Sequence, residues 1–137
     1  MKEKTASAAG QTAHASQDVT PKYFKLEEFS CRCGCGRNNI SPELIATLDK
    51  VRESAGIALR ITSGCRCAKH NEAVGGKSDS AHLEGLAADI AIGGSHERYL
   101  VSKAAMAAGV QRLGIGGSLV HMDIDKDKPQ EVAWLYA

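Results

Sequence analysis

A histidine and an aspartate lie seven residues apart in the stretch SAHLEGLAADI, with Gly85 between them. In one straight strand, His82 and Asp89 would be about 23 Å apart, and on one helix roughly 10.5 Å apart along the axis. Neither arrangement lets both side chains hold one small ligand. A turn at Gly85 would do so, because glycine adopts backbone conformations that other residues avoid. The spacing therefore predicts a bend that brings His82 and Asp89 together.

A second polar pair, His121 and Asp123, occurs in SLVHMDID and shares one face of a strand by alternation. Two imidazoles and one carboxylate suit catalytic zinc, which then keeps a fourth position for water. Zinc lowers the pKa of that water to about 7, and a nearby carboxylate can accept its proton. This hypothesis makes His82, Asp89 and His121 the metal ligands and Asp123 the general base. The alternative is a strand-end cap at Asp89 and a solvated strand face at His121 and Asp123.

The five cysteines form two clusters, CRCGC at residues 31–35 and CRC at residues 65–67. An odd number excludes complete internal pairing. Three alternatives stay open: free or partly paired thiols, one disulfide between the clusters, and a structural metal site. The C-x-C spacing is less typical of structural zinc than C-x2-C.

The bulk properties indicate one globular domain. A chain of 137 residues fits a single domain. Its net charge of +1 predicts no general attraction to nucleic acid or acidic membranes. No apolar run is long enough for a transmembrane helix, and the N-terminal stretch lacks the apolar core of a secretory signal. We expect a disordered arm over residues 1–21 and one domain over residues 22–137.

The pattern of apolar residues predicts an α+β domain with a small, mostly antiparallel sheet and flanking helices. Ser41, Pro42 and Gly56 mark the start and end of one helix, and Ser95 and Gly109 those of another. The long polar stretch 64–81 predicts a functional loop. Trp134 and Tyr136 are expected to pack on the core. Strands are predicted over residues 57–63, 86–92, 112–115 and 119–124.

Four motifs together resemble a known family. SAHLEGLAAD matches the pattern S-x-H-x2-G-x-A-x-D, and ITSGCRCAKHNEAVGG resembles an S-G-x-R segment followed by H-N and G-G. FKLEEFSCRCGCG resembles an N-terminal segment of phage-type members, and VHMDID resembles the H-x-D strand of one branch. In this order, from about Phe24 to Trp134, they resemble the M15 zinc peptidases. This group of D-Ala-D-Ala carboxypeptidases and phage-type endolysin peptidases shares its fold with hedgehog signalling domains.

The resemblance implies one catalytic Zn²⁺ held by His82, Asp89 and His121. It also implies that Arg66 faces the substrate and binds a carboxylate or carbonyl of a cell-wall peptide. Independently, a guanidinium forms charge-assisted bonds to carboxylates. Ser80 is expected either to hydrogen-bond near the site, as a substrate-binding residue, or to shape the turn before His82.

Two positions depart from the family pattern. Ser118 stands where many relatives carry Glu or Asp, which leaves Asp123 as the candidate general base. Cys65 stands where the family usually has an aromatic residue. That difference leads us to expect contact between the Cys65/Cys67 pair and the Cys31–Cys35 loop.

These features predict a zinc-dependent peptidase that hydrolyses amide bonds of peptidoglycan stem peptides, as a carboxypeptidase or an endopeptidase. The expected protein is a monomer that binds no nucleic acid and inserts into no membrane. It would stay in the cytoplasm until release and then act on the cell wall, as a phage or prophage enzyme does. One alternative is a non-catalytic cell-wall or protein-binding module that retains a structural zinc, which Ser118 in place of an acidic residue favours. A second alternative is a thiol-based redox or metal-storage protein.

Overall fold

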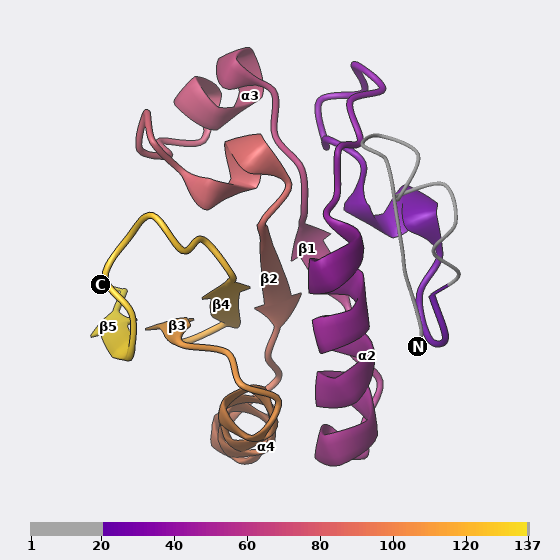
Figure 1. The fold of residues 1–137 in the computed structure, drawn as a ribbon, viewed down its shortest axis with the longest axis vertical. Helices are drawn as coiled ribbons and strands as arrows, with labels where there is room; N and C mark the ends of the chain where they lie inside the picture. Colours follow the sequence, from indigo (N-terminus) through magenta and orange to yellow (C-terminus); the bar gives the residue numbers. More distant parts are fainter. Residues whose placement is uncertain (1–20, 137) are drawn as a thin grey trace.

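A five-stranded sheet forms the centre of the fold (Figure 1). The computed structural model describes residues 21–136, so the arm predicted over residues 1–21 lies, but for its last residue, outside the described part. The strand order is β1-β2-β4-β3-β5, and every pairing is antiparallel except that of β3 with β5. The strands are β1 (Ile61–Ser63), β2 (Ala87–Ala91), β3 (Arg112–Ile115), β4 (Leu119–Asp123) and β5 (Val132–Leu135). The predicted α+β class with a mostly antiparallel sheet is confirmed.

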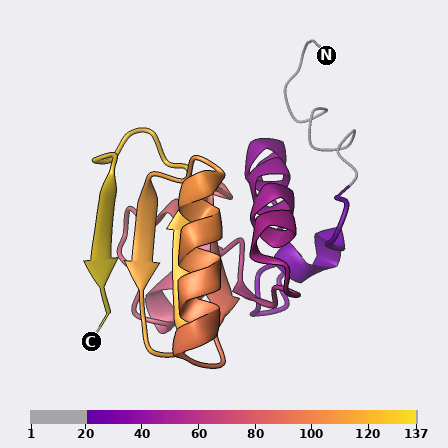
Figure 2. The same cartoon turned by 90° about the horizontal axis from the view of Figure 1, so that it is seen from below.

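Two longer helices, α2 (Pro42–Ala55) and α4 (Ser95–Ala107), pack against each other, and α4 also contacts β4 (Figure 2). The Ser41 hydroxyl accepts a hydrogen bond from the Leu44 amide, and Gly56 ends α2 in the left-handed conformation. This helix therefore begins and ends as predicted. For α4 the N-cap is Gly94 rather than the predicted Ser95, and Glu97 accepts from the Gly93 amide.

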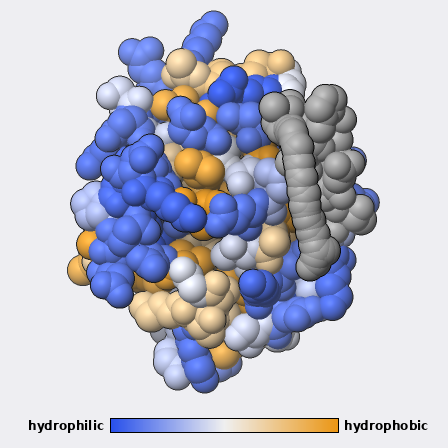
Figure 3. Space-filling model, in the orientation of Figure 1, coloured by the Kyte–Doolittle hydropathy of each residue, from blue (hydrophilic) through white to orange (hydrophobic). Residues whose placement is uncertain are grey.

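The hydrophobic core lies between the two helices and the sheet. Figure 3 shows hydrophilic residues over much of one face, with smaller hydrophobic groups between them. Within residues 21–136, no helix combines the length and apolar character needed to cross a membrane. The fully buried larger side chains include Phe29, Leu44, Ile45, Leu48, Val51, Ile90, Val101, Leu113, Val120 and Met122.

The predicted loop over residues 64–81 contains a short helix, α3 (Ala68–Ala73), and leads into a 3-10 helix, η2 (Ala81–Glu84). A polar helix of six residues that buries only Asn71 leaves no apolar periodicity to detect. Upstream of it, the first predicted strand is shorter than expected and is confined to Ile61–Ser63. A further 3-10 helix, η1 (Leu26–Phe29), packs beside β1.

The C-terminal segment differs from its predicted role. Residues 132–135 form β5, which pairs in parallel with β3. Trp134 is only partly buried and does not belong to the core cluster, and its ring lies 5.5 Å from that of His121. Tyr136 remains 45% exposed and stacks edge-on against Trp134. This segment thus borders the polar site rather than the hydrophobic core.

Candidate metal centre

The backbone bends at Gly85 as the spacing predicts. Ser80 caps η2, its hydroxyl accepting from the His82 amide at 3.2 Å, and η2 ends at Gly85 with a φ of 71°. A Cβ atom at Gly85 would lie 2.0 Å from the Asn39 carbonyl oxygen, so no larger residue fits there without displacement. The chain then enters β2, which carries Asp89. The turn therefore brings His82 back beside Asp89.

Pairing of β2 with β4 supplies the third side chain. Asp89 and His121 are direct partners across this antiparallel pair, and such partners have side chains on the same face of the sheet. The Nδ1 atom of His121 lies 2.8 Å from Oδ1 of Asp89, and Nε2 of His82 lies 3.3 Å from the same oxygen. One donor atom from each residue lies within 4.8 Å of the others, and all three residues are buried. The structure thus brings together the predicted ligand set.

Both imidazoles are held so that one nitrogen is available to a metal. Nδ1 of His82 lies 2.6 Å from the Gly64 carbonyl oxygen, and Nε2 of His121 lies 2.7 Å from Oδ2 of Asp123. A carbonyl and a carboxylate only accept hydrogen bonds, so both of these nitrogens carry a proton. In the neutral His82 ring the lone pair is then on Nε2. Nδ1 of His121 faces Oδ1 of Asp89 at 2.8 Å, a position for either a proton or a metal ion.

Nε2 of His82 is the atom that most directly indicates a cation-binding site. It is buried and has no hydrogen-bond partner among the described residues. A buried nitrogen without a partner is costly, and native structures rarely leave one so. Its neighbour is a carboxylate oxygen, a further metal ligand. These donors match the nitrogen and oxygen ligands of zinc, so the residues fit the metal.

Electrostatics reinforce the same arrangement. Burial opposes ionisation of Asp89, but the hydrogen bond to His121 and the nearby His82 ring outweigh it and hold the pKa of the carboxyl below its usual range. Burial lowers the pKa of His121, yet the bonds to Asp123 and Asp89 prevail and raise it. A proton on Nδ1 of His121 therefore occupies the position a metal would take, and the two compete.

Asp123 contacts the centre only through His121. Its Oδ1 accepts from Nε of Arg112 at 2.7 Å and from the Asp125 amide at 3.2 Å, and its Oδ2 accepts from His121. Burial raises the pKa of Asp123, but these donors, His121 foremost, lower it. With both oxygens bonded and only 2% of the residue exposed, Asp123 is placed to orient His121. Its role as general base stays a prediction.

Arg66 lies directly beside the three candidate ligands. Its Nη2 is 3.5 Å from Oδ2 of Asp89, Nη1 donates to the Asn71 side chain at 3.0 Å, and Nε donates to the Ser63 hydroxyl at 3.1 Å. The side chain is 13% exposed. The predicted place of Arg66 at the site is therefore observed, whereas Ser80 is seen shaping the turn before His82.

Four further residues lie at the site but were not predicted to belong to it: Gly64, Asn71, Arg112 and Trp134. Asn71 lies within the H-N motif, so a signal for it existed. The Gly64 carbonyl is a backbone group, which residue type does not reveal. Arg112 pairs with Asp123 because the two are partners in the β3–β4 register, and register was not part of the sequence argument.

Comparison with known proteins covers the same region. A family model described as Peptidase M15 matches residues 22–125. The matched region contains the three candidate ligands together with Arg66, Arg112 and Asp123, and it ends before β5 begins. No curated protein matches the chain.

Proposed function

Because the chain belongs to the Peptidase M15 family, as its motifs indicated, we propose that it is a zinc-dependent peptidase acting on peptidoglycan stem peptides. The proposal depends mainly on one observation: in each of the two imidazoles, the ring nitrogen that points away from the site is hydrogen-bonded to the protein. The Gly64 carbonyl fixes His82 and the Asp123 carboxylate fixes His121, so both free nitrogens converge on Asp89. Such outer hydrogen bonds are typical of histidines that bind metal.

His82, Asp89 and His121 would hold the zinc ion. When bound, zinc supplies a Lewis acid that activates water at neutral pH and polarises an amide carbonyl. The protein's own residues keep the site in shape. Asp123 keeps the His121 proton on Nε2, and Arg112 keeps Asp123 ionised and in place. The two imidazoles would therefore meet the metal in fixed orientations.

Arg66 is the residue we propose to bind substrate. Its contacts with Ser63, Asn71 and Asp89 leave one N–H on each terminal nitrogen without a partner among residues 21–136. A guanidinium binds carboxylates by parallel charge-assisted hydrogen bonds. Stem peptides carry carboxylates, at their C-terminal end among other places. Arg66 would hold such a group next to the zinc and so position the amide bond to be cut.

The test compares two histidine variants with the wild type. Zinc content is measured by elemental analysis, and hydrolysis by mass spectrometry of purified stem peptides and cross-linked muropeptides. His82→Ala should lose one equivalent of zinc and all turnover. His96→Ala should change neither, because His96 is an exposed residue at the start of α4. If the wild type holds zinc at this site and cuts no peptide but still binds cell wall, the protein is a binding module and the proposal is wrong.

A further inference from the structure

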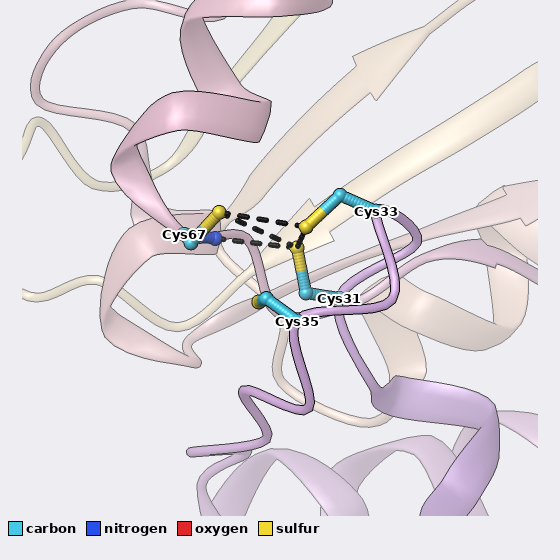
Figure 4. A group of neighbouring side chains, drawn as sticks. All are labelled: Cys31, Cys33, Cys35 and Cys67. Atoms are coloured by element: carbon cyan, nitrogen blue, oxygen red, sulfur yellow. Dashed lines mark hydrogen bonds between the residues drawn. The ribbon is translucent and has the colours of Figure 1, made fainter.

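Four of the five cysteines lie together in a group that is separate from the three candidate ligands (Figure 4). Cys31, Cys33 and Cys35 come from the loop after η1, and Cys67 is the N-cap of α3. All four Sγ atoms lie within 4.8 Å of one another. Figure 4 shows the thiols of Cys31, Cys33 and Cys67 facing one another across the gap between the two segments.

The sulfur–sulfur distances have the size expected for ligands of one ion. They are 3.5 Å for Cys31–Cys33, 3.7 Å for Cys33–Cys67 and 3.9 Å for Cys31–Cys67. With Zn–S bonds of about 2.3 Å, the edge of a ZnS₄ tetrahedron is about 3.8 Å. A disulfide requires about 2.05 Å. The three distances agree with one another and with a tetrahedron, whereas a disulfide would bring one pair close and leave the others apart.

We propose that Cys31, Cys33, Cys35 and Cys67 bind a second, structural Zn²⁺ ion, separate from the candidate catalytic one. The backbone is shaped for this. In an extended segment, residues two apart share one side but lie about 6.6 Å apart along the chain. Gly34 and Gly36, with φ values of 86° and 87°, curl the loop and bring them closer. Three thiols spaced two residues apart can thereby face one position. The unusual C-x-C spacing is thus compatible with a single ion.

Backbone amides also point at the sulfurs. The Cys67 amide donates to Sγ of Cys31 at 3.4 Å, and the His70 amide donates to Sγ of Cys67 at 3.3 Å. Amide donors favour the thiolate form, which is the form that binds metal. Four thiolates around one tetrahedral position are characteristic of zinc or iron–sulfur sites. Distances near 3.8 Å fit a single ion rather than a cluster of several irons.

The fifth cysteine, Cys65, does not belong to this group. Cys65 is buried, and its thiol contacts the Asn38 side-chain oxygen at 3.5 Å rather than the other sulfurs. The expected contact between the Cys65/Cys67 pair and the Cys31–Cys35 loop is therefore made by Cys67. The site joins that loop to the start of α3. Arg66 immediately precedes Cys67, and α3 carries Asn71, so the ion would fasten the segment that holds Arg66.

The experiment counts zinc in four proteins purified identically without chelator. The wild type should hold two equivalents, and Cys33→Ser/Cys35→Ser should hold one, since both changed side chains are exposed and need not perturb folding. Cys65→Ala is the matched control and should hold two. His82→Ala should hold one. X-ray absorption of the His82→Ala protein should then show an all-sulfur shell at about 2.3 Å.

Cobalt substitution gives a readout independent of zinc content. The Co²⁺ form of His82→Ala should show a thiolate-to-metal charge-transfer band that Cys33→Ser/Cys35→Ser abolishes. The inference is wrong if the double cysteine variant keeps all its zinc, if the absorption shell contains no sulfur, or if mass spectrometry of the native protein shows a disulfide among these four residues. Iron in place of zinc would overturn the assignment of the ion. A chain that loses zinc only with His82→Ala refutes this site and leaves the proposed function standing.

Discussion

Replacing Asp123 by asparagine tests whether this residue orients His121 or takes up a proton. The carboxylate accepts from His121 and from Arg112, each at 2.7 Å, through different oxygens. Asparagine has one acceptor oxygen and one NH₂ group, so one of these donors must face another donor. If the NH₂ faces His121, the ring takes the opposite tautomer and Nδ1 carries the proton. His121 then no longer offers a lone pair to zinc.

The expected effect is on metal affinity. Losing an outer hydrogen-bond partner of a metal ligand weakens binding by about 10- to 100-fold, which corresponds to about 1.4–2.7 kcal/mol. Asp123→Asn should therefore bind zinc at the histidine site that much more weakly, and saturating zinc should restore most of its kcat. Asp125→Asn is the matched control. Asp125 is also buried and lies two residues further on, and its side chain pairs with Lys128 rather than with a histidine.

Zinc affinity is measured by competition with a chromophoric chelator in the Cys33→Ser/Cys35→Ser background, which leaves the histidine site alone. Turnover is measured in the same protein over a range of zinc concentrations. A general base would behave differently, because its removal lowers kcat without releasing metal. If Asp123→Asn binds zinc as tightly as the parent protein and kcat falls at least 100-fold at saturating zinc, the orienting role is refuted.

Three other perturbations have definite expected outcomes. Gly85→Ala should destabilise the protein by more than about 2 kcal/mol, because a positive φ alone costs ~1–2 kcal/mol and the new Cβ meets the Asn39 carbonyl; urea unfolding measures this. Arg66→Lys should raise KM about 10- to 100-fold with zinc content unchanged, since a lost charge-assisted bond costs ~1.5–3 kcal/mol; steady-state kinetics decide. Lowering the pH should weaken zinc binding at the histidine site, because the raised pKa of His121 favours the competing proton. For the stability of the zinc-free protein, the pH dependence has the opposite direction. The raised pKa of His121 stabilises the fold at pH values below the unfolded pKa of about 6.5. This stabilisation is lost as the pH rises through the pKa of His121 in the folded protein.

The sequence predicted local features best, where a residue type at one position determines a turn or the end of a helix. The spacing of His82, Gly85 and Asp89 predicts a bend, and the structure has the bend with glycine in the left-handed conformation. Ser41 and Gly56 mark the ends of α2 for similarly local reasons. Strand alternation placed His121 and Asp123 on one face. The bend and the shared strand face could be predicted because each depends only on nearby residues, whereas His121 joins His82 and Asp89 through the pairing of β2 with β4.

Several features that depend on the pairing of distant strands were not predicted. The pairing of Arg112 with Asp123 follows from the register of β3 against β4, and a shift of one residue would move Arg112 to the other face. Strand β5 follows a long connection and pairs in parallel with β3. Its residues are mostly exposed, so β5 lacks the alternation of buried and exposed positions from which a strand is predicted. The position of Trp134 beside His121 is a consequence of that pairing.

The two histidines present different nitrogens because they approach Asp89 from different kinds of backbone. His121 is the direct cross-strand partner of Asp89, so its Cβ starts about 5 Å away and the nearer ring nitrogen, Nδ1, suffices. His82 comes from η2, and its outer nitrogen, Nε2, reaches the site while Nδ1 bonds the Gly64 carbonyl. A strand histidine that uses Nδ1 has its Nε2 directed along the same face, where the residue two positions on can meet it. In the proposed ligand set, the H-x-D pattern thus places the candidate ligand His121 and the carboxylate that holds its outer nitrogen on one strand.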